Sequence, residues 1–110
     1  MNAIDLGPLE SIPLGEGRSC AVAGEEIAVF RTREGEVLAV QARCPHQGGP
    51  LADGLVGNGS VVCPLHAFRF DLRSGRPLGR GCPPLLTYTI QVTPTGHLLL
   101  FPGSQRQAVA

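Results

Sequence analysis

Two short stretches decide the fold of this chain: CPHQGGP at residues 44–50 and CPLH at residues 63–66. Each places a cysteine and a histidine within three residues of one another, beside proline or glycine residues that favour loops. Thiolates and imidazoles are both common metal ligands, and the two stretches together supply two of each. The pattern therefore predicts one metal site shared by two loops, with Cys44, His46, Cys63 and His66 as its ligands.

The composition is typical of one small domain with many turns. The chain has 110 residues, 43% of them hydrophobic, with 15 glycines and 10 prolines. This length suits a single domain, which we expect to span residues 1–110. Nine basic and nine acidic residues cancel, and no basic run is present. We therefore expect no nucleic-acid partner.

The N-terminal residues and the apolar runs bear on the expected cellular location of the protein. MNAIDLGPLE has neither a positive n-region nor an apolar h-region, so a signal peptide is not expected. The apolar runs are far shorter than the roughly 20 residues that a membrane span needs. The sequence thus predicts a soluble, cytoplasmic protein with no membrane association. In a reducing compartment, cysteines beside histidines are expected to bind metal rather than to form disulfides.

Alternating strand-like runs predict an all-β fold of short antiparallel strands. Two hairpins are expected from such runs, and two short strands flank the second cysteine–histidine pair. The middle of the chain, about residues 42–84, is richest in glycine, proline and candidate ligands, and is expected to form a subdomain on a β scaffold. Residues 103–110 are expected to be a loose tail. The expected strands are 26–32 with 37–40, 86–92 with 97–101, 60–63 and 68–71.

The order of the ligands bears on the metal. Zinc accepts two cysteines and two histidines in a tetrahedron, but zinc fingers usually pair cysteine with cysteine and histidine with histidine. Here each loop carries one of each. This arrangement suits a binuclear cluster in which both cysteines bind one iron and both histidines bind the other.

The two boxes, Cys44-Pro45-His46 and Cys63-Pro64-Leu65-His66, resemble the C-x-H and C-x-x-H boxes of the Rieske [2Fe–2S] family. GGPL at 48–51 and FRFDLRSG at 68–75 are similar to that family too, and GCPP at 81–84 resembles its third, proline-containing loop. The resemblance implies an antiparallel β-sandwich or barrel with a cluster-binding subdomain built from two ligand loops and a proline loop.

The same resemblance implies the cofactor and the role of each ligand. A Rieske [2Fe–2S] cluster would have one iron bound by Cys44 and Cys63 and the other by the Nδ1 atoms of His46 and His66. Neutral imidazoles in place of anionic thiolates make the cluster easier to reduce, so its potential rises above that of an all-cysteine cluster.

Four positions bear on which type of Rieske protein the chain resembles. Gly49 and Leu65 stand where high-potential members carry two disulfide-bonded cysteines. Phe68 and Phe70 stand where those members place a serine and a tyrosine whose hydroxyls bond sulfur. With fewer hydrogen bonds to sulfur, the reduced state is less stabilised. We expect a potential near the bottom of the roughly −150 to +300 mV Rieske range.

The chain carries no dinucleotide fingerprint and no flavin motif, so an electron carrier with a redox partner protein is expected rather than a catalyst on its own. Two settings fit. The stretches REGEVLAVQARCPHQGGPLADG and GCPPLLTYTIQV resemble the small subunit of assimilatory NAD(P)H nitrite reductase, which we favour slightly. A free ferredoxin that serves a ring-hydroxylating oxygenase is the alternative. A third possibility from another class is a zinc-stabilised interaction module.

Four further residues carry expectations of their own. Cys20 is expected to be a buried strand residue, and Cys82 to lie near the cluster without binding it. His97 is expected at the surface. Ala67 departs from the glycine often found after the second histidine, which matters only if that position needs a positive φ.

Overall fold

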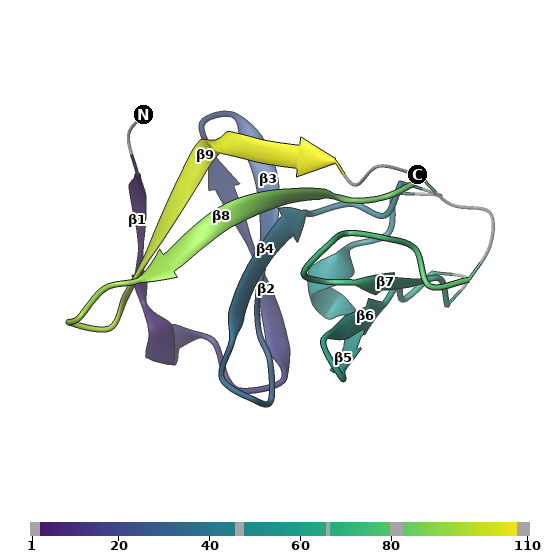
Figure 1. Cartoon of the computed structure of the whole chain (residues 1–110), viewed down its shortest axis with the longest axis horizontal. Helices are drawn as coiled ribbons and strands as arrows, with labels where there is room; N and C mark the ends of the chain where they lie inside the picture. Colours follow the sequence, from purple (N-terminus) through teal and green to yellow (C-terminus); the bar gives the residue numbers. More distant parts are fainter. Residues whose placement is uncertain (1–2, 46–47, 66, 80–82, 108–110) are drawn as a thin grey trace.

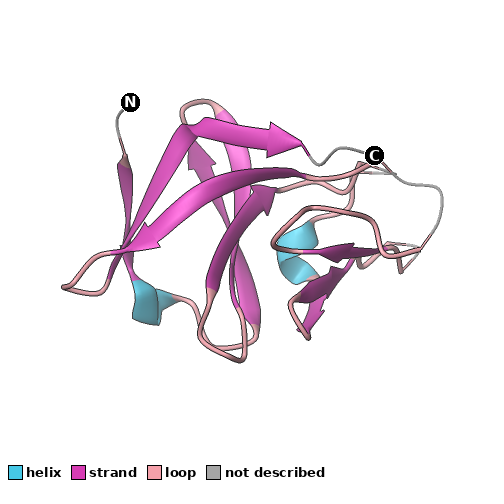
Figure 2. Cartoon of the chain, in the orientation of Figure 1, coloured by secondary structure: helices cyan, strands magenta, loops and turns pink. Residues whose placement is uncertain are grey.

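The computed structural model describes residues 3–45, 48–65, 67–79 and 83–107. Within these residues the regular structure is almost entirely β (Figures 1 and 2). Two 3₁₀ turns accompany the strands: η1 (Leu9–Ser11) and η2 (Leu51–Asp53). The strands are β1 (Ile4–Pro8), β2 (Glu16–Val22), β3 (Glu25–Arg31), β4 (Val37–Gln41), β5 (Leu55–Gly57), β6 (Ser60–Val62), β7 (Arg69–Asp71), β8 (Leu86–Val92) and β9 (His97–Gln107).

The larger sheet has the strand order β1-β9-β8-β4-β3-β2, and its neighbouring strands pair antiparallel. It curves into a nearly closed barrel-like scaffold, with the smaller sheet beside it (Figure 1). Both expected hairpins of this sheet, β3–β4 and β8–β9, are confirmed. The all-β antiparallel fold predicted from the sequence is therefore confirmed.

The C-terminal strand is longer than expected. β9 continues to Gln107, where Leu86 pairs with Gln107 and Thr87 with Arg106 after an irregularity in the β8–β9 register. The expected loose tail from residue 103 therefore differs from the structure as far as Gln107. Residues 108–110 lie outside the described residues. Pro102 and Gly103, two residues that weaken a strand, lie in the irregular part of the register, and the pairing resumes at Arg106.

The smaller sheet, β5-β6-β7, carries the second cysteine–histidine pair. Strands β6 and β7 confirm the two short strands expected there, within a residue. Strand β5 was not expected. It is joined to β6 by Asn58 and Gly59 with φ of 52° and 72°, the left-handed pair that a two-residue hairpin turn requires.

One hydrophobic cluster joins the two sheets. Phe30 and Val40 of the larger sheet pack with Val61 and Phe70 of the smaller one, and all four are fully buried. Burying a side chain of this size contributes roughly 1.5–3 kcal/mol. The smaller sheet is thus held to the scaffold by a shared core. The exact limits of a subdomain at residues 42–84 stay a prediction.

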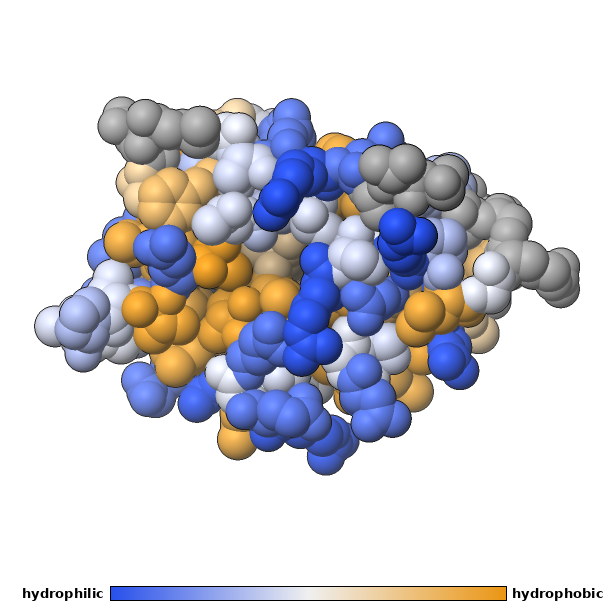
Figure 3. All heavy atoms as spheres, in the orientation of Figure 1, coloured by the Kyte–Doolittle hydropathy of each residue, from blue (hydrophilic) through white to orange (hydrophobic). Residues whose placement is uncertain are grey.

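A second cluster fills the scaffold and is closed by half-buried side chains of β1, β4 and β8. On the face drawn in Figure 3, apolar and hydrophilic side chains are mixed, with an apolar area over β8 and β9. Neither 3₁₀ turn, nor any other helical segment of the described residues, is long and apolar enough to cross a membrane.

Candidate metal centre

The first ligand loop, residues 44–49, is separated from the end of β4 by two residues. The Cys44 N–H donates to the Gly49 carbonyl at 2.8 Å, and the Gly48 N–H donates back to the Cys44 carbonyl at 2.7 Å. A bridge between Arg43 and Pro50 closes the base of the loop. Backbone bonds therefore fix the loop on both sides of its cysteine.

The second ligand loop, residues 63–68, connects β6 to β7. The Cys63 N–H donates to the Phe68 carbonyl at 2.7 Å. In both loops the cysteine N–H is thus bound by the carbonyl of the fifth residue after it. Two loops of equal span, each opening on a cysteine, are a suitable frame for ligands that share one metal centre.

Both cysteines are buried in the core that joins the two sheets. Cys44 is 3% exposed and Cys63 is 1% exposed, and the buried residues of their cluster are all apolar or small. The absence of acidic and basic side chains among them leaves the sulfurs as the polar groups of that cluster. Buried sulfurs in apolar surroundings fit a site whose cofactor must be shielded from water.

The two ligand loops touch each other at Gly49. A Cβ atom added there would lie 3.0 Å from the Cys63 Sγ and 3.1 Å from the Leu65 Cγ. Position 49 of the first loop therefore faces positions 63 and 65 of the second. With glycine at one position and leucine at the other, the disulfide of high-potential Rieske proteins has no counterpart here.

Arg43 is a supporting residue that the sequence did not single out. Its Nε pairs with Glu26 at 3.2 Å, and its Nη1 donates to the Gly48 carbonyl at 3.3 Å. The arginine therefore ties the first ligand loop to β3. In the sequence, only its position next to Cys44 could have pointed to this role. A single arginine beside a loop does not predict a structural contact.

Two of the four expected ligands, His46 and His66, lie outside the described residues, as does Cys82. In the rest of the chain, where the structure is described, no group of three histidine, cysteine or acidic side chains could hold a metal. The structure therefore brings together the cysteine half of the expected site. The donor chemistry of that half, two buried thiols on paired loops, fits an iron–sulfur cluster.

The two phenylalanines next to the centre differ in burial. Phe70 is fully buried in the cluster that holds both cysteines, and the half-buried Phe68 packs against it. Neither position offers a hydroxyl to a cysteine sulfur. Whether the potential is low, as the sequence predicts from these two apolar rings, stays a prediction.

Three residues outside the two boxes can also be compared with their expectations. Cys20 lies in β2 but is only half buried. His97 is partly exposed at the start of β9, as expected, and its Nδ1 lies 3.0 Å from the Asp5 carboxylate. Ala67 has a φ of 56°, so this position does adopt the left-handed conformation that favours glycine.

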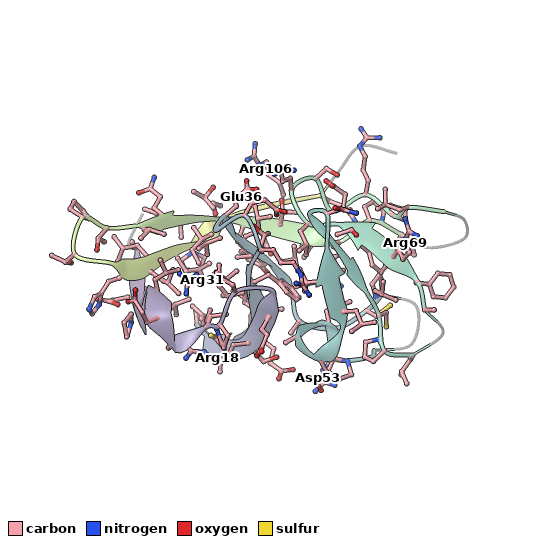
Figure 4. All side chains as sticks on the ribbon, turned by 90° about the horizontal axis from the view of Figure 1, so that it is seen from below. Arg18, Arg31, Glu36, Asp53, Arg69 and Arg106 are labelled. Atoms are coloured by element: carbon pink, nitrogen blue, oxygen red, sulfur yellow. The ribbon has the colours of Figure 1, made fainter. Side chains whose placement is uncertain are left out.

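The charged residues labelled in Figure 4 are spread over the molecule. Its four arginines come from β2, β3, β7 and β9, and Arg69 lies at the end that carries the smaller sheet, away from Arg18 and Arg31. Glu36, which forms an ion pair with Arg73, lies on the same side as Arg106. These labelled side chains do not gather at one place on the molecule.

Comparison with known proteins gives one family and several relatives. The family described as Rieske [2Fe–2S] domain matches residues 2–89. A curated relative, the ferredoxin component of naphthalene 1,2-dioxygenase/salicylate 5-hydroxylase systems from a Ralstonia species, is 36% identical over 95 residues. This match covers 83% of the present chain and 88% of the relative. The 4beta-methylsterol monooxygenase of Methylococcus capsulatus is 40% identical over 90 residues, but the match spans only 24% of that longer protein.

Solved structures agree in fold. The ferredoxin of carbazole 1,9a-dioxygenase from Nocardioides aromaticivorans superposes with a TM-score of 0.83 at 27% identity, covering 91% of this chain and 97% of that one. A structure described as a putative NADH-dependent nitrite reductase small subunit from Mycobacterium tuberculosis superposes with a TM-score of 0.84 at 25% identity, covering 98% and 97%.

Proposed function

Because the chain belongs to the Rieske [2Fe–2S] family, we propose that Cys44, His46, Cys63 and His66 hold its cluster and that it works as a low-potential one-electron carrier. When bound, such a cluster takes up and releases one electron at a time. The observation that carries the ligand assignment is the pair of buried cysteines on two equal, touching loops.

The chain itself supplies a rigid and dry setting for that chemistry. The backbone bonds of the two ligand loops fix both cysteines, and Arg43 fixes the first loop from outside. The apolar cluster around Cys44 and Cys63 keeps water from the sulfurs. Preformed ligands need little rearrangement when the charge of the site changes, which favours fast electron transfer.

The proposed setting is an oxygenase system, in which this chain would deliver electrons to a larger oxygenase. Support comes from the naphthalene-type ferredoxin component, which is 36% identical and matches over most of the length of both chains. For this reason we rank the oxygenase setting above the nitrite reductase small subunit, which the sequence alone slightly favoured.

The nitrite reductase setting remains the second candidate function, because a separate structural match favours it. The nitrite reductase small-subunit structure from Mycobacterium tuberculosis covers nearly the whole of this chain. In that setting the chain would be bound to a large, sirohaem-containing subunit rather than acting as a free carrier. The two settings therefore differ in whether the partner is permanent.

The first test is the metal content of anaerobically purified protein. We expect about two irons and two acid-labile sulfides per chain, with the visible and EPR signatures of a Rieske centre. Cys44→Ser and Cys63→Ser are expected to lose the cluster, whereas Cys20→Ser, at a half-buried cysteine in another part of the fold, is the matched control and keeps it. Zinc in place of iron would support the interaction-module alternative.

The second test separates the two settings. The reduced protein is added to a purified ring-hydroxylating oxygenase, and product is measured with and without the chain. Turnover that depends on the chain supports the oxygenase setting. Co-purification with a sirohaem-containing subunit, together with no oxygenase turnover, would replace it with the nitrite reductase setting.

A further inference from the structure

Leu65 lies in the second ligand loop, between Cys63 and His66, and the residue is 43% exposed. The side chain leans toward the first ligand loop. A Cβ atom added to Gly49 would lie 3.1 Å from Leu65 Cγ, 3.2 Å from Leu65 Cδ1 and 3.0 Å from Cys63 Sγ. The Leu65 side chain and the Cys63 sulfur therefore both lie against the backbone of Gly49.

Cys63 is buried although the loop residues that follow it are exposed, so some neighbouring group must cover its sulfur. Its sulfur is nearly inaccessible, with 1% of the residue exposed, although the next two residues, Pro64 and Leu65, are exposed. The loop therefore passes from the core to the surface within two residues of this cysteine. The groups shown to stand beside it at this side are the backbone of Gly49 and the isobutyl group of Leu65.

We propose that Leu65, packed over Gly49, is an apolar cover that keeps water from the Cys63 sulfur and holds the potential of the centre low. The proposal rests on the proposed function, since it assumes that Cys63 binds the cluster. Gly49 completes the cover, because any side chain there would push Leu65 or the sulfur aside. Leu65 is thus a positioning residue that acts through the Cys63 ligand.

The expected effect has a definite sign. Reduction adds one negative charge to the centre, and nearby water stabilises that charge more than a hydrocarbon does. Solvent exposure is one of the factors that set the potential of an iron–sulfur cluster. Removing the cover should therefore raise the potential, and should also open the ligand sulfur to chelators and oxygen.

The test compares three variants of the cluster-loaded protein with the wild type. Leu65→Ala removes the cover, and Leu65→Met keeps a side chain of similar volume. Leu78→Ala is the matched control, because Leu78 is about as exposed as Leu65, at 42%, but lies outside the two ligand loops. Two quantities are measured: the reduction potential, by protein-film voltammetry, and the rate at which the visible absorbance is lost in air with a chelator.

Leu65→Ala is expected to raise the potential and to speed the loss of absorbance several-fold, whereas Leu65→Met and Leu78→Ala stay close to the wild type. An unchanged potential in Leu65→Ala, or an equal shift in Leu78→Ala, would overturn the cover while leaving the proposed function intact. A wild-type chain that binds no iron would overturn both proposals, so the two failures can be told apart.

Discussion

Ala67 is a residue whose backbone conformation opposes its side chain. Its φ of 56° lies in the left-handed region, which a Cβ atom makes unfavourable by about 1 kcal/mol or more. It follows the second expected histidine, within the loop closed by the Cys63 N–H and the Phe68 carbonyl. The sequence analysis expected Ala67 to cost no stability unless its position needs a positive φ. The structure shows that the φ of Ala67 is positive.

We therefore predict that Ala67→Gly increases the free energy of unfolding by about 0.5–1 kcal/mol, because the strain is relieved by more than the added chain entropy costs. Chemical denaturation of the cluster-loaded protein measures this. Ala21→Gly, at an exposed position in β2, is the control and should lower stability instead. A stabilisation of equal size in both variants would contradict the strain argument.

Gly75 shows the opposite case, a glycine that both its conformation and its neighbours require. Its φ is 79°, and a Cβ atom there would meet the Leu85 carbonyl oxygen. The turn that carries it is bound to the chain leading into β8, since the Leu85 N–H donates to the Gly75 carbonyl at 2.8 Å. The close approach of the smaller sheet to the scaffold depends on this missing side chain.

Gly75→Ala is accordingly predicted to lower the free energy of unfolding by about 2 kcal/mol or more, from backbone strain and a displaced contact together. Gly96→Ala is the matched comparison, because its φ of 83° is similar but open space surrounds it. Thermal unfolding of both variants should show the larger loss for Gly75→Ala. Equal losses would mean that the contact with Leu85 adds nothing to the strain.

At the scale of the element, β1 is held to the larger sheet by a charged contact at its start. The Asp5 carboxylate accepts hydrogen bonds from the Gly7 N–H at 2.8 Å and lies 3.0 Å from His97 Nδ1 on β9. The Gly7 bond, followed by the His97 bond, keeps the pKa of the Asp5 carboxyl below its ordinary value. A carboxyl whose pKa is depressed by folding stabilises the fold only while it is ionised.

This contact predicts a pH dependence with a fixed sign. Asp5→Asn should be less stable than the wild type above the ordinary carboxyl pKa of about 3.9. The difference should fall as the pH drops through the lower pKa of the folded protein. Denaturation curves of both proteins from neutral to strongly acidic pH measure it. A difference that stays constant down to the lowest pH would exclude the carboxylate as its source.

The elements differ in how well local sequence predicts them. The β3–β4 and β8–β9 hairpins follow from alternation and a turn, and the structure confirms both. Strand β2 was expected only around Cys20, because Gly17, near its start, weakens the local strand pattern. In the structure Gly17 pairs with Phe30, whose ring covers the space beside it. The contact with Phe30 makes up for the missing side chain of Gly17, but it comes from strand pairing in the folded protein. The local sequence around Gly17 therefore does not predict it.

At the scale of the whole molecule, the alternating strand-like runs predicted the fold class, and the two cysteine–histidine boxes carried the resemblance from which the family and the cofactor were expected. The contact between the two ligand loops could not be, because it depends on how the smaller sheet packs on the scaffold. Gly49 looked like one glycine among many in the sequence, and only the structure places it against Cys63 and Leu65.

The central claim is that these loops carry a low-potential, histidine-ligated cluster, and protein-film voltammetry across a range of pH tests it most directly. The account predicts a one-electron wave near the lower end of the Rieske range, about −150 mV, that is flat through neutral pH and falls only in alkaline solution as the histidine ligands lose protons. A wave well above zero would contradict the interpretation of Phe68 and Phe70. No wave at all, with zinc bound instead of iron, would contradict the electron-transfer function itself.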